Sequence, residues 1–218
     1  MKKLVFLLFF SPFILLCQIS NQLDDNGNRQ GNWLKYHENG NVKYKGQFKD
    51  NKPYAIFYYY YDTGELKIEK EFFHNGKAAA THFFYKNGSL RSSGIYVNQL
   101  KDSTWNYYSI DSNIVMSEQY KKGKLNGPTK TFYYNGSPYE IKYWKNDTLH
   151  GLWKQFFMDG TLKMVSSYEN QLRHGKETHY YPNGKIYSKG EYVNDSKKGV
   201  WQFFSEEGVL DTTINYNE

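Results

Sequence analysis

Cysteine is almost absent from this sequence, since Cys17 is the only one among 218 residues. It ends an apolar stretch near the N-terminus, so removal of that stretch would leave a chain without any thiol. Disulfide bonds and thiol catalysis are then excluded, even in an oxidising compartment that permits disulfides.

A long hydrophobic run is missing as well. The apolar segment Leu4 to Leu16 has 13 residues, whereas a membrane-spanning helix needs about 20. Because the basic residues Lys2 and Lys3 precede it, we interpret residues 1–17 as a secretory signal peptide. The alternative is a lipoprotein anchored at Cys17, which the bulky residue before the cysteine disfavours. The sequence therefore predicts export to the periplasm, the cell surface or the medium.

Blocks of one charge are also lacking, because no run of five or more like charges occurs. The formal net charge is +6, from 28 basic and 22 acidic residues, and loss of Lys2 and Lys3 leaves 26 basic residues. A nucleic-acid-binding surface needs a clustered basic stripe. We therefore expect no nucleic-acid partner.

Aliphatic residues are sparse, and aromatic rings take their place. Aromatic residues make up 19% of the chain, with 22 Tyr and 15 Phe, at a mean hydropathy of -0.81. A disordered chain would be poor in aromatics, so this chain has apolar groups to bury. Aromatic side chains together with frequent turn residues favour strands over helices.

One sequence pattern recurs at a fixed interval of 24 residues. Its anchor is a glycine in seven of eight copies: Gly40, Gly64, Gly88, Ser112, Gly136, Gly160, Gly184 and Gly208. A constant period without insertions is the signature of a repeat architecture. The chain is therefore predicted to contain eight 24-residue repeats.

Aromatic residues accompany the anchor in a constant register. The residue four before the anchor, here called the aromatic column, is aromatic in all eight repeats: Tyr36, Tyr60, Phe84, Tyr108, Phe132, Phe156, Tyr180 and Phe204. The residue eight after the anchor is aromatic in all eight as well, and the residue two after it is a branched aliphatic except at Pro138. Such regularity indicates that the rings build one continuous layer.

Each repeat is predicted to be a β-hairpin. The anchor follows Asn39 or an equivalent residue, and Asn-Gly between apolar runs is the strongest short-range hairpin signal. A primed turn, which needs positive φ, is expected there. The second strand alternates, which predicts that one set of its residues faces the core: Val42, Tyr44, Gly46 and Phe48.

A second column of small residues lies nine before the anchor: Gly31, Ala55, Ala79, Ser103, Gly127, Gly151, Gly175 and Gly199. Small residues at a fixed strand position predict a tight bend or a close backbone approach.

Eight hairpins give about sixteen strands in an all-β fold, which we expect to be an elongated, curved antiparallel meander of about eight tandem β-hairpins. Open sheets of more than ~10 strands tend to curl. Because each repeat contacts its neighbours, no boundary is needed between repeats. The mature chain is therefore divided into a lead-in, residues 18–29, and a single repeat domain, residues 30–218.

The frame Gly-x-Trp-x-x-Tyr-x-x-Asn-Gly-x-Leu, followed by the aromatic residue eight after the second glycine, resembles the MORN-repeat-variant family. This resemblance implies β-hairpin units in an elongated sheet. Bacterial members are often labelled antitoxin-like, and MORN proteins are generally regarded as scaffolds or membrane-associated interaction modules. A comparable role is what the resemblance implies here.

Catalytic motifs are missing: the sequence has no Gly-x-Ser-x-Gly and no phosphate-binding glycine loop. We expect no enzyme activity, no catalytic residue, no cofactor and no metal. Glu177 and His179 share a strand face and could ligate a metal. An exposed polar pair is the preferred interpretation, because no third ligand is apparent.

The residue seven before the anchor, here called the Trp column, is a large ring in five repeats: Trp33, Phe57, Trp105, Trp153 and Trp201. If the aromatic column faces the core, the Trp column faces the other way and forms an exposed ladder at ~9.6 Å spacing. Such rings suit a protein partner or sugar stacking. The alternative is that curling or a local bulge buries them. The Trp column is our predicted partner-binding site.

The sequence thus predicts an exported, non-catalytic repeat scaffold that mediates protein–protein interaction. By family resemblance alone it could be antitoxin-like or immunity-like, masking the surface of a toxin or effector. The alternative is a cell-envelope or glycan-binding module that uses an exposed Trp/Tyr ladder. A membrane surface is a further partner class.

Overall fold

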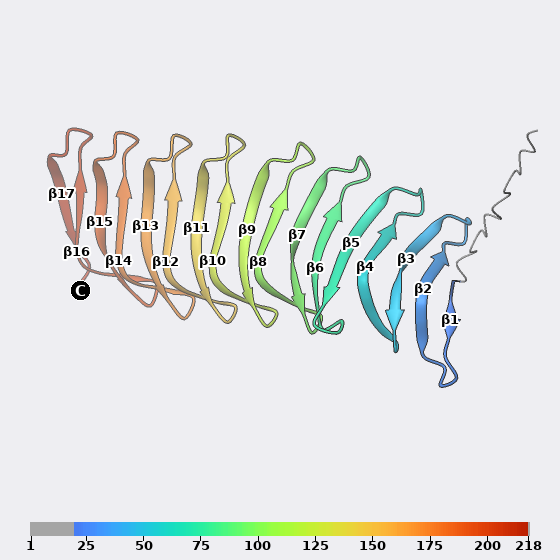
Figure 1. Cartoon of the computed structure of the whole chain (residues 1–218). Helices are drawn as coiled ribbons and strands as arrows, with labels where there is room; N and C mark the ends of the chain where they lie inside the picture. The colour runs from blue at the N-terminus through green and yellow to red at the C-terminus, as the bar shows by residue number, and fades with distance from the viewer. Residues whose placement is uncertain (1–19, 218) are drawn as a thin grey trace, which may run out of the picture.

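The computed structural model describes residues 20–217, which form one open antiparallel sheet of 17 strands. Figure 1 shows an elongated sheet that does not close on itself, with β1 and β17 at its two ends. The predicted signal peptide and Cys17 lie outside the described residues. Within residues 20–217 no helix is long and apolar enough to cross a membrane.

Each repeat contributes two strands. The first strands are β2 (Arg29–Tyr36), β4 (Lys52–Tyr60), β6 (Ala78–Phe84), β8 (Leu100–Tyr108), β10 (Lys124–Phe132), β12 (Thr148–Phe156), β14 (Leu172–Tyr180) and β16 (Ser196–Phe204). The second strands are β3 (Val42–Lys49), β5 (Leu66–Phe73), β7 (Leu90–Val97), β9 (Ile114–Lys121), β11 (Pro138–Lys145), β13 (Leu162–Glu169), β15 (Ile186–Val193) and β17 (Leu210–Asn215). A short β1 (Gln22–Leu23) precedes them.

The strands pair in chain order, each antiparallel to its neighbours. In the first hairpin Trp33 of β2 lies opposite Gly46 of β3, and the same register recurs along the sheet. Among the described strands, β1 pairs with β2 alone and β17 pairs with β16 alone. The predicted all-β meander of tandem hairpins is therefore confirmed. The sheet stays open, so curling covers neither face.

The turn at the anchor differs from the predicted primed turn. Gly40 has a φ of 87°, but Asn39 has no positive φ. The Gly40 amide donates to the His37 carbonyl at 3.0 Å, and the His37 amide donates to the Asn41 carbonyl at 2.8 Å. This is a three-residue loop that ends in a left-handed residue. The expectation of a primed turn here is wrong, although the glycine is needed for its positive φ.

Primed turns occur instead in the two-residue links between repeats. In the link from β3 to β4, Asp50 and Asn51 have φ angles of 50° and 63°. Asn146 and Asp147 repeat this pattern with φ angles of 51° and 66°. Asn and Asp adopt the left-handed region more readily than other residues with a Cβ. Short turns thus connect the strands at both of their ends. The anchor loops lie at the top of Figure 1 and the links between repeats lie at the bottom.

Bulges bend the first strands at the second column of small residues. Between β3 and β4 the partner of Lys45 is Tyr58, whereas the partner of Gln47 is Tyr54, so β4 has two extra residues there. Seven members of that column have positive φ: Gly31, Ala55, Ser103, Gly127, Gly151, Gly175 and Gly199. The predicted tight bend is confirmed at these seven positions.

The link between β5 and β6 keeps the same period in a different way. Its register runs without a shift from Ile68 opposite Phe83 to Phe73 opposite Ala78. The turn between these strands, residues 74–77, is four residues long instead of two. The two extra residues therefore lie in the turn, and Ala79 accordingly has no positive φ.

The two faces of the sheet differ in burial. We call the face that carries the Trp column the ring face and the opposite face the reverse face. Tyr44 and Phe48 pack against Phe57 on the ring face, with ring centroids 6.4 and 5.1 Å apart. The buried residues of the ring face are Phe48, Phe57, Ala79, Thr81, Ser92, Trp105, Met164, Ser166, Glu177, Ser188, Tyr192 and Trp201. The predicted core-facing set of the second strand is confirmed for Tyr44 and Phe48.

Tyrosine hydroxyls connect the anchor loops of successive repeats. The Tyr85 hydroxyl donates to the Tyr108 carbonyl at 2.9 Å, 23 residues ahead. Tyr61, Tyr133 and Tyr181 make the same bond to the next repeat, each at 2.9 Å. Each bond satisfies a backbone acceptor where the strand ends. The stack of repeats is therefore linked by side chains as well as by strand pairing.

Candidate interaction surface

Three rings of the predicted Trp column are buried. The exposed fractions of Phe57, Trp105 and Trp201 are 2%, 1% and 2%. The aromatic column lies on the other, reverse face, where the Lys45 ammonium stands 5.7 Å from the ring of Tyr60. The two columns do face opposite ways, as predicted. However, the deeply buried rings belong to the Trp column, whereas the aromatic column, which was expected in the core, is half-buried or exposed. An exposed ladder is wrong for Phe57, Trp105 and Trp201, and a role of the column in partner binding remains a prediction.

Glycine, rather than curling, accounts for this burial. Gly46 lies beside Phe57 on the adjacent strand, and a Cβ at Gly46 would overlap the ring. Gly94 and Gly190 stand in the same relation to Trp105 and Trp201. Each ring therefore packs against bare backbone, which no other residue would allow.

The sequence contains a signal for these ring sites that the Trp column alone does not show. A glycine stands eleven residues before the buried ring in three repeats: Gly46–Phe57, Gly94–Trp105 and Gly190–Trp201. A larger residue at the glycine position goes with a smaller or polar residue at the ring position in three others: Lys70–Thr81, Glu118–Thr129 and Ser166–Glu177. This coupled pattern distinguishes a ring that packs on glycine from a ring ladder that faces solvent.

The remaining two members of the Trp column are half-buried. Trp153 has Lys142 at the glycine position, and the Lys142 ammonium lies 4.6 Å from the ring centroid. The Trp153 indole donates to Glu140 at 3.0 Å, and Lys142 also pairs with Glu140 at 2.8 Å. Trp33 donates to the Gln30 carbonyl at 3.1 Å. These rings are held by polar partners and cations.

A polar network occupies the ring face beside Trp105. The Tyr107 and Tyr120 hydroxyls both donate to the Glu118 carboxylate, at 2.6 and 2.8 Å. The Lys101 ammonium donates to the Tyr107 hydroxyl at 2.6 Å. Burial, followed by the hydrogen bond to Glu118, raises the pKa of Tyr120 to about 12 and that of Tyr107 further. Burial also lowers the pKa of Lys101. The network is internally satisfied and holds β8 to β9.

Glu177 and His179 do come together, as the sequence suggested. His179 Nε2 lies 2.9 Å from a Glu177 carboxylate oxygen. Glu177 is only 6% exposed, so the expectation of an exposed polar pair is wrong for this residue. Burial is the largest single influence and raises the pKa of Glu177, but the lowering effects of His179, Ser166 and Arg173 together outweigh it and leave the pKa below its usual value. Residues 20–217 contain no group of three or more metal-ligating side chains.

The reverse face changes character along the chain. Eight side chains at mid-strand of β10 to β13 form what we call the reverse patch: Pro128, Lys130, Ile141, Tyr143, Leu152, Lys154, Val165 and Ser167. Tyr143 and Leu152 are 39% and 38% exposed. Five of the eight side chains are apolar or aromatic, and none is acidic. An apolar surface of this kind on a single-layer sheet is a candidate binding site.

Lys130 and Lys154 give the reverse patch its charge. Across the four strands the two lysines alternate with aliphatic residues. Ile141 pairs with both lysines, and Val165 pairs with Lys154. Neither ammonium has a hydrogen bond or an ion pair within the described residues. The reverse patch is therefore apolar with two uncompensated positive charges.

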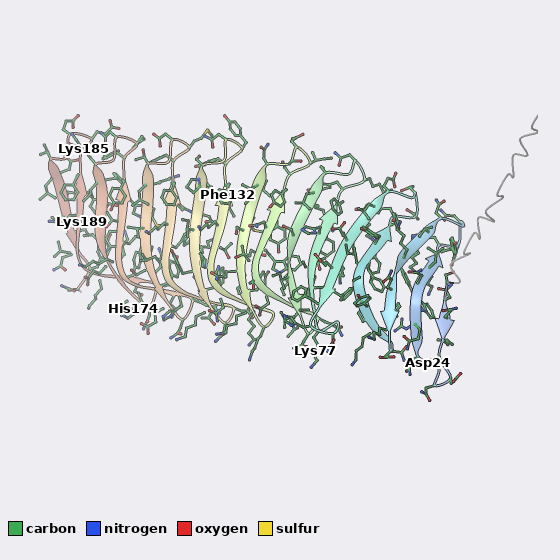
Figure 2. The ribbon with its side chains drawn as sticks, viewed as in Figure 1. Asp24, Lys77, Phe132, His174, Lys185 and Lys189 are labelled. Carbon is green, nitrogen blue, oxygen red and sulfur yellow. The ribbon has the colours of Figure 1, made fainter. Side chains whose placement is uncertain are left out.

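The aromatic column extends this surface toward the anchor loops. Figure 2 labels Phe132, a member of the column on β10, and shows a single layer of strands with side chains on it. All members except Tyr36 are half-buried. A partner that covered the reverse patch would also lie close to Phe132 and Phe156, the members of the column on β10 and β12.

Comparison with known proteins identifies the repeat type. Residues 29–50, 125–146, 149–170 and 173–194 match the family described as the MORN repeat variant. Each segment begins in a first strand and ends just after the second strand of the same repeat. A search of curated proteins gives no match. Repeats of this family in a single-layer sheet are not typical of enzymes.

Proposed function

Because the chain contains MORN-variant repeats, we propose that it is an exported, non-catalytic scaffold that binds protein through its reverse face. MORN repeats are generally interaction modules for proteins or membranes. The observation that carries the proposal is the reverse patch, where exposed Tyr143 and Leu152 adjoin the unpaired Lys154. Apolar groups interleaved with lysines suit a protein surface better than a polyanion.

Two parts of this proposal rest on other grounds. Export rests on the predicted signal peptide, residues 1–17, and the antitoxin-like role rests on family resemblance. A protein that leaves the cytoplasm would meet a toxin or effector in the periplasm or at the cell surface. It would neutralise that partner by covering its surface. No catalytic step is required for such a role.

The test is differential capture with matched variants. Residues 18–218 serve as bait against envelope and secreted fractions of the source cell. One variant carries Tyr143→Ser and Leu152→Ser in the reverse patch. The control carries Tyr134→Ser and Leu172→Ser, which are 80% and 40% exposed and lie outside it. Circular dichroism establishes that both variants are folded.

We expect one protein to be captured by the wild-type and control baits and lost with the reverse-patch variant. Mass spectrometry then identifies it. Equal capture by all three baits, or capture of no protein, would overturn a protein-binding role for the reverse face.

Glycan binding is the second candidate, favoured by exposed rings near the anchor loops. Tyr139 and Tyr187 are 42% and 46% exposed, and each packs edge-on against Tyr133 or Tyr181 with centroids 5.3 Å apart. Such rings could stack on sugars, although Phe57, Trp105 and Trp201 are too deeply buried to form part of a ladder. Retention on a polysaccharide column, competed by soluble sugar and lost with Tyr139→Ser, would favour this candidate.

A further inference from the structure

We propose that the protein which covers the reverse face is a second copy of this chain, packed face to face as a two-layer sandwich. This inference rests on the proposed use of the reverse face for protein binding. It identifies the partner by complementarity between two regions of the same surface.

The reverse face of the second and third repeats carries the opposite charge. The equivalent mid-strand positions of β4 to β7 are Ile56, Tyr58, Glu69, Glu71, Ala80, His82, Ser93 and Ile95. This acidic patch has two carboxylates and no lysine, whereas the reverse patch has two lysines and no carboxylate. Glu69 has one ion pair, to His82 at 3.6 Å, and its side chain is 33% exposed. The chain therefore presents an acidic and apolar surface that suits its own basic and apolar surface.

A twofold axis can place these two regions opposite each other without shifting either copy along the strand direction. Rotation by 180° about an axis parallel to the strands reverses the strand order and preserves the position along each strand. If the axis lies between β8 and β9, then β5 faces β12 of the partner copy and β4 faces β13. The contact is then isologous, so it closes as a dimer.

Three of the residue pairs that this axis brings together are complementary in charge, polarity or size. Glu69 of one copy faces the partner's Lys154, and Tyr58 faces the partner's Val165. The small Ala80 faces the partner's Tyr143, which needs the space. At the axis itself the facing side chains are the neutral Asn106 and Ser117, which pair with each other on neighbouring strands.

The area matches that of a stable interface. The ten strands from β4 to β13, at ~4.8 Å spacing and with five residues each at ~3.3 Å, give a footprint on the order of 800 Å² per copy. A standard specific interface buries about this much on each partner. Sheets packed in this way lie ~10 Å apart with their inner side chains interdigitated. The members of the aromatic column on β4 to β12, which are half-buried in a single copy, would become more deeply buried.

Charge-reversed variants give a decisive test by sedimentation velocity of residues 18–218. Lys154→Glu places two like-charged pairs in its own homodimer, and Glu69→Lys does the same with the opposite sign. A mixture of these two variants restores both pairs in a heterodimer. Lys185→Glu, at the anchor-loop edge (Figure 2), is the control with the same change in net charge.

We expect the wild-type protein and the control to be dimeric at ~100 μM, a concentration at which an interface of this size is occupied. Each charge variant alone should weaken self-association by ~10-fold or more. Their mixture should recover the dimer. A monomeric wild-type protein, or a dimer that both reversals leave unchanged, would overturn the inference. If the wild-type protein is monomeric while the reverse-patch variant still loses a different captured protein, the proposed function stands and the second copy does not.

Discussion

The second and third repeats and the fifth and sixth repeats are built from the same hairpins but place their mid-strand carboxylates on opposite faces. In the former, Phe57, Phe72 and Tyr96 fill the ring face, while Glu69 and Glu71 lie on the reverse face. In the latter, the ring face carries Glu140 and Lys142, and the reverse face carries the apolar reverse patch. A repeat therefore specifies the hairpin but leaves the choice of the apolar face open.

The reason is that this sheet has a single layer. Strand pairing and turns satisfy the backbone in every repeat, so neither face needs to be the sole core. Whether a ring is buried on the ring face depends on one residue of the neighbouring strand. Gly94 allows Trp105 to pack directly on the backbone. Glu118 and Lys142 occupy the same position in other repeats, and their side chains prevent such packing. Variation at this glycine position thus decides whether a repeat uses its ring face for internal packing.

The largest effect should come from removing a ring that packs on glycine. Trp105→Ala should lower the free energy of unfolding by ~3–5 kcal/mol, because it empties a site that is 1% exposed. Trp153→Ala, in the polar region, should cost clearly less, since Trp153 is half-buried. Urea denaturation of both variants measures the difference. Equal losses would show that the two regions do not differ in packing.

A smaller loss should follow from filling the glycine itself. Gly94→Ala places a Cβ against the Trp105 ring, and such overpacking costs ~1–3 kcal/mol. Lys142→Ala occupies the same column next to Trp153 without that overlap. It should lose only the contact of its ammonium with the ring. Thermal unfolding of the pair gives the comparison, and a neutral Gly94→Ala would contradict the ring-on-glycine explanation.

The polar network beside Trp105 should be visible in an alkaline titration. A phenol whose pKa is raised in the folded protein supports folding below its ordinary value of 10.0 and loses that contribution as the pH rises through about 12. Glu118→Gln should lower the pKa of Tyr120, although burial still keeps it above 10.0. The near-ultraviolet absorbance of tyrosinate follows the change. If tyrosinate formation at high pH is unchanged in the variant, then Glu118 does not raise the pKa of these tyrosines.

The sequence predicted the repeat, the hairpins and the bends because each depends on one or two residues at a fixed spacing. Gly40 and Gly31 are examples, since backbone conformation at each is a local property. The sequence did not predict which column is buried. Burial of Trp105 depends on Gly94, which lies on a neighbouring strand. The alternating pattern that contains its counterpart Gly46 does not by itself show that a ring packs on the glycine. The reverse patch was missed for the same reason, because Ile141 and Lys154 become neighbours only through strand register.

The smallest effect should be a gain in the region where the tyrosine link is interrupted. Phe157 occupies the position from which Tyr85 and Tyr133 donate to the next repeat. Phe157→Tyr should add that bond to the Tyr180 carbonyl and stabilise the fold by ~0.5–1 kcal/mol, the net worth of a hydrogen bond. Tyr85→Phe should remove a bond of the same kind and lose a similar amount or slightly more, because a backbone acceptor is left without its partner. Opposite shifts in the urea midpoint at unchanged slope would support this symmetry. Loss of stability in both variants would show that the loop at Phe157 is shaped differently from the loops that carry tyrosine.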